Sequence, residues 1–149
     1  MAKFDFRLQP LLNVRSQQED NLKNELGKAI QRLEAEKGKL RRLEGELGEL
    51  VREFNEKAKK TTVRSLIEYN EYLSLLHSNI KLQKENVNNA AENVDKVREA
   101  LVQAVKERQI LDKYREKKLE EYLQEQKRLE QRTNDEIVSY KHSESGTGE

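Results

Sequence analysis

The sequence contains no cysteine and no tryptophan, only one proline, and no hydrophobic run long enough to cross a membrane. The absence of cysteine excludes disulfides, a thiol nucleophile and thiolate metal ligands. A membrane-spanning helix needs roughly 20 mostly apolar residues, and the opening MAKFDFRLQ lacks the apolar core of a secretory signal. We therefore expect a cytoplasmic protein.

An excess of charge of one sign is also missing, because 29 basic and 28 acidic residues leave a net charge of +1. Nucleic-acid-binding proteins usually carry a strongly basic face, so we expect no nucleic-acid partner. Charged residues make up 38% of the chain and aromatic residues 5%, which is typical of long helices and coiled coils rather than of a globular core.

Apolar residues follow a heptad pattern through the first third of the chain. Steps of four and three residues from Leu8 to Phe54 meet an apolar side chain at eleven of fourteen positions. This first seam comprises Leu8, Leu12, Arg15, Glu19, Leu22, Leu26, Ala29, Leu33, Glu36, Leu40, Leu43, Leu47, Leu50 and Phe54. The pattern is that of a coiled coil and predicts a helix over about residues 8–57.

A second seam follows the segment KAKKTTVR, residues 57–64. It comprises Tyr69, Leu73, Leu76, Ile80, Gln83, Val87, Ala90, Val94, Val97, Leu101, Ala104, Arg108 and Leu111. The segment between the seams has neither Gly nor Pro, so the helix could continue through it, but the reset spacing favours a bend over about residues 58–64. We predict a second helix over about 65–140 and a disordered polar tail over 141–149.

Two seams in one chain predict an all-α fold, an antiparallel two-helix coiled coil in which the second helix is longer than the first. The whole chain, residues 1–149, would form this single helical-hairpin domain. Facing residue numbers then sum to about 123, which pairs Phe54 with Tyr69 and Leu43 with Ile80. A register one heptad away would also align the seams, but it needs a bend of another length.

Polar residues interrupt both seams. Arg15 would face Arg108, with Glu19, Glu107 and Asp112 near enough to neutralise the two cations. Such a layer either fixes the register as a solvated charged layer or serves a partner. We interpret the other polar seam positions, Glu36 and Gln83, as structural.

The N-terminal segment carries two of the three phenylalanines, Phe4 and Phe6, ahead of Pro10. Proline suits the first turn of a helix, because its missing N–H has no helical partner there. The two aromatic residues therefore precede the helix. They either fold onto the second helix near Leu119 and Tyr122, or insert into another protein.

The segment SLIEYNEYLSLL, residues 65–76, is the most apolar part of the chain. One seam cannot bury all of its large side chains. Those left over are Leu66, Ile67, Tyr72 and Leu75. They form either a partner-binding surface or the contact of a third helix or a homodimer.

No catalytic constellation is present. The chain has neither a GxxxxGK[ST] loop nor a GxGxxG motif, and its two histidines, His77 and His142, stand far apart. We expect no enzymatic activity, no cofactor and no metal site, and a function in binding other proteins.

Two segments resemble the flagellar FliJ family. FDFRLQPLLNVRSQQED, residues 4–20, resembles the family's N-terminal signature, and KERQILDKYREKKLEEYLQEQKRLEQRTNDE, residues 106–136, resembles its charged segment with an Asp–Glu pair at the end. In length and layout the resemblance extends over almost the whole chain, and the N-terminal start is its most specific part.

The resemblance implies a cytosolic component of the flagellar type III export apparatus, at the cytoplasmic face of the inner membrane. Family members are coiled coils similar to the central stalk of rotary ATPases. The implied partners are the hexameric export ATPase FliI, the export gate FlhA and export chaperones, with membrane association only through the apparatus.

Residue roles follow from the same resemblance. The implied contacts with the ATPase ring are Phe6, Arg7, Arg15, Arg108, Arg115 and Lys118. The implied contacts with the gate or a chaperone are Tyr72, Leu76, Asn79 and Gln83. Two alternatives are a structural coiled coil that dimerises in trans without any ATPase, and the stalk of an injectisome.

Overall fold

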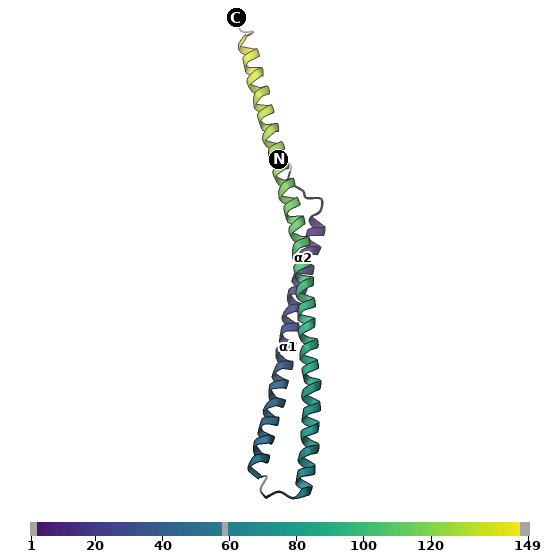
Figure 1. Ribbon diagram of the computed structural model, residues 1–149. Coiled ribbons are helices and arrows are strands. Elements are labelled where there is room, and N and C mark those ends of the chain that lie inside the picture. The colour runs from purple at the N-terminus through teal and green to yellow at the C-terminus, as the bar shows by residue number, and fades with distance from the viewer. Residues whose placement is uncertain (1–2, 58–59, 147–149) are drawn as a thin grey trace. The chain divides into compact units, whose positions relative to one another are not determined.

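The computed structural model describes residues 3–57 and 60–146. Apart from a single residue in 3₁₀ conformation, Lys60, the regular secondary structure of these residues is α-helical. Helix α1 spans Gln9–Lys57 and helix α2 spans Val63–Gly146. The two helices run antiparallel and α2 is the longer (Figure 1). The predicted all-α helical hairpin is therefore confirmed.

The helix ends follow local hydrogen bonding. The Gln9 N–H donates to the Phe6 carbonyl at 3.0 Å, which closes a turn directly before Pro10 in the first turn of α1. The hydroxyl of Thr62 accepts the Ser65 N–H at 3.3 Å. Thr62 thus caps α2, which begins at Val63, two residues before the predicted start.

The C-terminal boundary differs more from the prediction. Residues 141–146 were predicted to be disordered, but α2 continues through them to Gly146. The Tyr140 hydroxyl lies 3.4 Å from a Glu144 carboxylate oxygen, and the Ser145 hydroxyl donates to the His142 carbonyl. These short-range contacts support helix where a polar composition suggested a tail. Residues 58–59 of the predicted bend and 147–149 of the tail lie outside the described residues.

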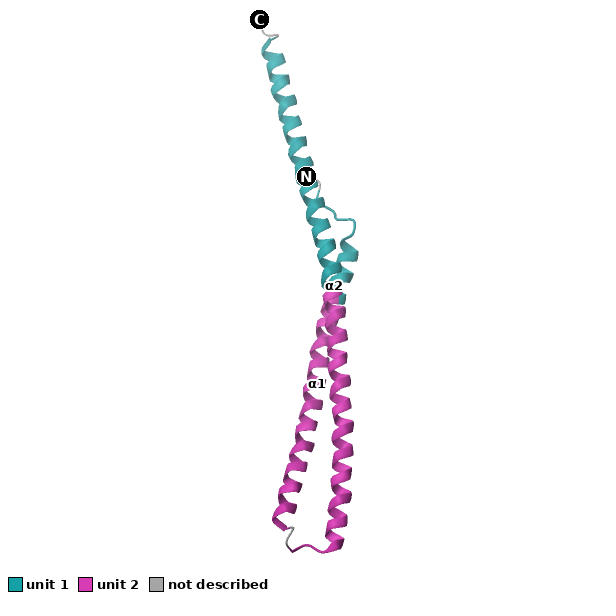
Figure 2. Ribbon diagram, in the orientation of Figure 1, with its two compact units in different colours: residues 1–18, 104–149 teal, residues 19–103 magenta. Residues whose placement is uncertain are grey.

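The chain divides into two compact units (Figure 2). Unit 1 comprises residues 1–18 and 104–149, and unit 2 comprises residues 19–103. In both units the positions of the two seams are buried or half-buried, while most of their neighbours on the helices are exposed. The heptad pattern therefore identified the contact face of each helix.

A contact in unit 2 tests the predicted register of the two helices. The rings of Phe54 and Tyr69 stack with their centroids 3.8 Å apart, and their residue numbers sum to the predicted 123. The most buried apolar side chains of this unit are Ala29, Leu76, Ile80, Ala90 and Val94. Removing such side chains from water is the main stabilising term for a two-helix pair, at about 25 cal/mol per Å² of apolar surface.

Candidate partner-binding surfaces

The N-terminal segment folds onto α2 within unit 1. We call residues 3–8 the strap. The ring of Phe4 lies 5.4 Å from the ring of Tyr122, and the ring of Phe6 lies 5.9 Å from the ring of Tyr114. Phe6 is only 6% exposed. Of the two predicted arrangements of these aromatic residues, the structure has the one in which they pack against the second helix.

Two cations of α2 lie over aromatic rings of unit 1, and one of them, Arg115, contacts the strap. The Arg115 guanidinium lies 5.6 Å from the centre of the Phe4 ring, and its Nε donates to Gln9 Oε1 at 3.0 Å. Lys118 Nζ lies 5.5 Å from the centre of the Tyr114 ring. A cation over an aromatic face is attracted by the negative potential of the ring. The family resemblance implied both cations as contacts with the ATPase ring. In the structure, both already make contacts within unit 1.

Lys118 also pairs with Glu121, whose carboxylate lies 3.4 Å from Nζ. The hydrogen bond and the negative charge of Glu121 raise the pKa of Lys118 above its usual value. A raised pKa means that this contact is fully present below the ordinary lysine pKa and is lost as pH rises through the higher value. Because Lys118 is open to solvent, the ammonium remains available to a partner.

A hollow of about 570 Å³ lies between the strap and α2. Its lining combines the aromatic rings with three cations, Lys3, Arg7 and Lys118, and a single acid, Asp5. Arg7 is exposed. Unit 1 thus presents positive charge beside aromatic surface, a combination that suits an acidic protein partner.

The charged layer of unit 1 is neutralised much as the sequence predicted. Arg15 Nη1 donates to Glu107 Oε2 across the two helices at 2.7 Å, and Arg108 pairs with Asp112 one turn further along α2. Glu19, the third predicted acid, pairs with Lys23 at 3.3 Å in unit 2. Arg15 and Arg108 are therefore both engaged in ion pairs rather than held free on the surface.

The residues implied for the gate or a chaperone all lie in unit 2, but they do not form one surface. Tyr72 is 47% exposed and Asn79 is exposed. Leu76 is only 3% exposed and Gln83 only 8%, because both occupy seam positions that face α1. Only Tyr72 and Asn79 of this set can meet a partner without opening the hairpin.

Further exposed apolar residues lie close to Tyr72 in the sequence of α2. They are Leu66, Ile67 and Leu75, the last at 55% exposed. The heptad pattern predicts them as side chains left out of the seam, whereas the family resemblance does not imply them as contacts with the gate or a chaperone. Their signal was the apolar surplus of residues 65–76, and they extend the exposed apolar surface of unit 2.

Other kinds of site are not found in the part of the chain that the structure describes. Residues 3–57 and 60–146 contain no group of three or more His, Asp or Glu side chains that could hold a metal ion. Neither of the two helices, over the same residues, has a stretch long and apolar enough to span a bilayer.

Comparison with known proteins complements this geometry. The family model described as "Flagellar FliJ protein" matches residues 4–147. Among solved structures, a YscO homolog from Chlamydia trachomatis is similar, with a TM-score of 0.74 and 23% sequence identity over 99% of this chain and 100% of that chain. At this identity the likeness concerns the fold. The search of curated protein sequences found no match.

Proposed function

Because the chain belongs to the FliJ family of flagellar proteins, we propose that it is a non-enzymatic component of the flagellar type III export apparatus. In this role it is a central-stalk-like coiled coil for the hexameric ATPase FliI. It links the ATPase to the export gate FlhA at the cytoplasmic face of the inner membrane and escorts export chaperones. The observation that carries the proposal is the family match over residues 4–147.

The proposed mechanism rests on thermodynamic linkage between stalk binding and assembly of the ATPase hexamer. A protein that binds the assembled ATPase hexamer but not its separate subunits stabilises the hexamer by mass action. The exposed cations of unit 1, Arg7 and Lys118, suit a ring lined by acidic groups. Phe6 is buried, so its role in this proposal is to hold the strap, and with it Arg7, against α2.

ATP hydrolysis by the cognate export ATPase, titrated with this protein, tests the proposal. We expect stimulation that rises together with hexamer formation in sedimentation. Replacing both Arg7 and Lys118 with Ala should raise the concentration for half-maximal stimulation by about tenfold, which corresponds to about 1.4 kcal/mol. No stimulation by the folded, helical wild-type protein would reject the stalk role.

A matched control removes the same charge elsewhere. Lys28 and Arg41 are exposed in unit 2 and belong to neither implied set. The double variant Lys28→Ala, Arg41→Ala loses two cations, as the test variant does, and should stimulate the ATPase like the wild type. An equal loss in both variants would mean that only net charge matters and would reject the assignment to unit 1.

The second surface has its own test. Replacing Tyr72 and Asn79 with Ala should weaken binding to the cytoplasmic part of the gate at least tenfold and leave ATPase stimulation unchanged. Val102→Ala, which trims an exposed apolar side chain of the same helix, is the control. Loss of both activities together in the Tyr72 and Asn79 variant would contradict the two-surface arrangement.

A further inference from the structure

One stretch of α2 is unusually rich in asparagine. Residues 86–93 read NVNNAAEN and hold four of the eleven asparagines in the chain. Asparagine is a weaker helix former than the Lys, Glu, Gln and Ala that cover the rest of this surface, because its amide competes for backbone hydrogen bonds. Helix formation therefore does not account for this concentration.

Three of these asparagines line a hollow of about 350 Å³ in unit 2. We call it the asparagine groove, lined by Arg32, Glu36, Asn86, Asn89, Ala90 and Asn93. Ala90 is almost fully buried in the seam, and its small side chain leaves room beside the larger polar residues. The groove thus has an apolar floor and polar walls from both helices.

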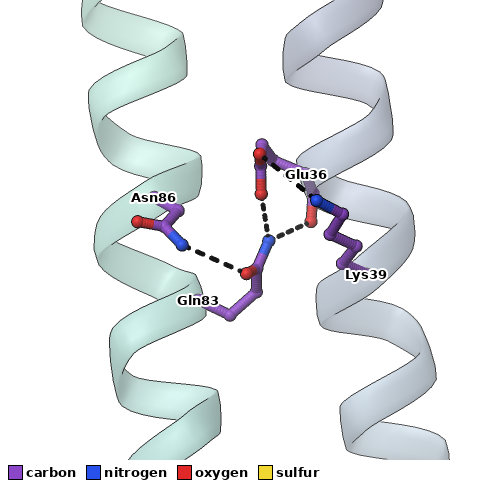
Figure 3. A network of polar contacts seen from close by, with 4 residues as sticks. All are labelled: Glu36, Lys39, Gln83 and Asn86. Atoms are coloured by element: carbon purple, nitrogen blue, oxygen red, sulfur yellow. Dashed lines mark hydrogen bonds and ion pairs between the residues drawn. The ribbon is translucent and has the colours of Figure 1, made fainter.

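Two polar residues of the groove, one on each helix, are held in place by hydrogen bonds (Figure 3). Gln83 Nε2 donates to the Glu36 carbonyl at 2.9 Å and to its carboxylate at 2.5 Å, and Asn86 Nδ2 donates to Gln83 Oε1 at 3.2 Å. Lys39 lies 3.8 Å from the Glu36 carboxylate. Glu36 and Asn86 are therefore positioned before any ligand arrives.

Three other polar side chains of the groove make no polar contact within the described residues. Among residues 3–57 and 60–146, the side chains of Arg32, Asn89 and Asn93 have no hydrogen-bond or ion-pair partner. An asparagine amide offers donors on its nitrogen and an acceptor on its oxygen, which is the complement of a peptide group. The guanidinium of Arg32 adds donors only.

The spacing of the two free amides matches an extended chain. Asn89 and Asn93 are one helical turn apart, roughly 6 Å along the axis at 1.5 Å per residue. Alternate peptide groups of an extended chain repeat every 6.6–6.8 Å or so. The two amides can therefore pair with peptide groups two residues apart on one strand.

We propose that the asparagine groove binds an extended stretch of polypeptide through its backbone. Asn89 and Asn93 pair with alternate peptide groups, and Arg32 donates to a neighbouring carbonyl. Because the contacts go to the main chain, binding has little selectivity for side chains. The proposal does not depend on the stalk role, since none of these residues belongs to the surface assigned to the ATPase.

The test is an NMR titration of the full-length protein with a blocked, uncharged, unstructured peptide of alanine, serine and threonine. We expect the side-chain amide signals of Asn89 and Asn93 to shift. The double variant Asn89→Ala, Asn93→Ala should bind at least tenfold more weakly. Alanine is the better helix former, so this variant keeps the fold, which circular dichroism checks.

Two controls make the outcome decisive. Asn88→Ala removes an exposed amide of the same turn that does not line the groove, and it should bind like the wild type. The same peptide with N-methyl groups on every amide cannot donate to the asparagine oxygens and should bind at least tenfold more weakly. Absence of any shift, equal loss in Asn88→Ala, or unchanged binding of the methylated peptide would each overturn the proposal. None of these outcomes bears on ATPase stimulation.

Discussion

Glu36 and Gln83 occupy seam positions that a coiled coil normally fills with apolar side chains. Within the described residues, no buried side-chain nitrogen or oxygen lacks a hydrogen-bond partner, so this polar layer is fully satisfied. Such a layer adds little net stability compared with apolar residues, but it disfavours registers in which its members lose each other. Its role is therefore to specify one alignment of the two helices.

The polar layer yields a prediction for stability. Gln83→Leu removes the hydrogen bond to Glu36 and should lower the free energy of unfolding by about 1–3 kcal/mol, because the half-buried carboxylate then keeps only the exposed Lys39 as a partner. The double variant Glu36→Leu, Gln83→Leu should recover this loss or exceed the wild type. Urea denaturation measures both, and strictly additive losses would contradict the coupling.

Phe6 yields a second prediction at the scale of the residue. Phe6→Ala removes the aromatic ring that packs against Tyr114. The substitution should release the strap from α2 without unfolding the hairpin. Hydrogen exchange at the Gln9 N–H, which donates to the Phe6 carbonyl, should then accelerate, while exchange in unit 2 stays unchanged. Phe4 is less buried than Phe6, so Phe4→Ala should have the smaller effect; the reverse order would argue against Phe6 as the anchor.

At the scale of the element, α1 tolerates glycines in its interior. A Cβ atom added at Gly27, Gly45 or Gly48 would meet no atom within 4 Å, and no described residue has a positive φ. Packing and backbone geometry thus do not require glycine at these three positions. The cost of each in an exposed helix is about 0.8–1 kcal/mol relative to alanine.

The triple variant Gly27→Ala, Gly45→Ala, Gly48→Ala should therefore stabilise the protein by about 2.4–3 kcal/mol. Thermal unfolding followed by circular dichroism would show a higher midpoint. A lower midpoint would mean that α1 needs the flexibility of these glycines. If the variant is stabilised as expected, its ATPase stimulation shows whether the flexibility of these glycines serves function.

The pairing of the two helices gives another prediction. Since the chain has no native cysteine, Phe54→Cys with Tyr69→Cys should form a disulfide under mild oxidation, because these side chains stack in the seam. Phe54→Cys with Leu76→Cys, shifted by one heptad, should not. Gel mobility with and without reductant distinguishes the two, and efficient closure of the shifted pair would mean that the register slides.

At the scale of the whole molecule, the hairpin closes its seam within one chain. Its thermal midpoint should therefore not change with protein concentration, and sedimentation should give a mass near 17.6 kDa. A coiled coil that dimerises in trans would melt at higher temperature as concentration rises. This measurement separates the hairpin from the scaffold alternative without any partner protein.

The fold class and the two seams can be read from the sequence alone, whereas the choice between registers one heptad apart rests on the stacked rings of Phe54 and Tyr69. A heptad pattern reports which side of a helix avoids water, and two such patterns in one chain leave few ways to pair. It also placed Leu76 and Gln83 in the seam. The resemblance to the family placed the same two residues on a partner-binding surface, and the structure, in which both are buried, favours the heptad pattern.

Three features required the tertiary structure: the place of the strap, which acid pairs with Arg15 and which with Arg108, and the groove that Asn86, Asn89 and Asn93 share with Arg32. The strap has no periodicity, so its sequence could not distinguish packing on α2 from insertion into another protein. The groove depends on the small side chain of Ala90 and on residues more than 50 positions apart. Periodicity encodes which face of a helix is buried, whereas these features depend on which distant side chains meet.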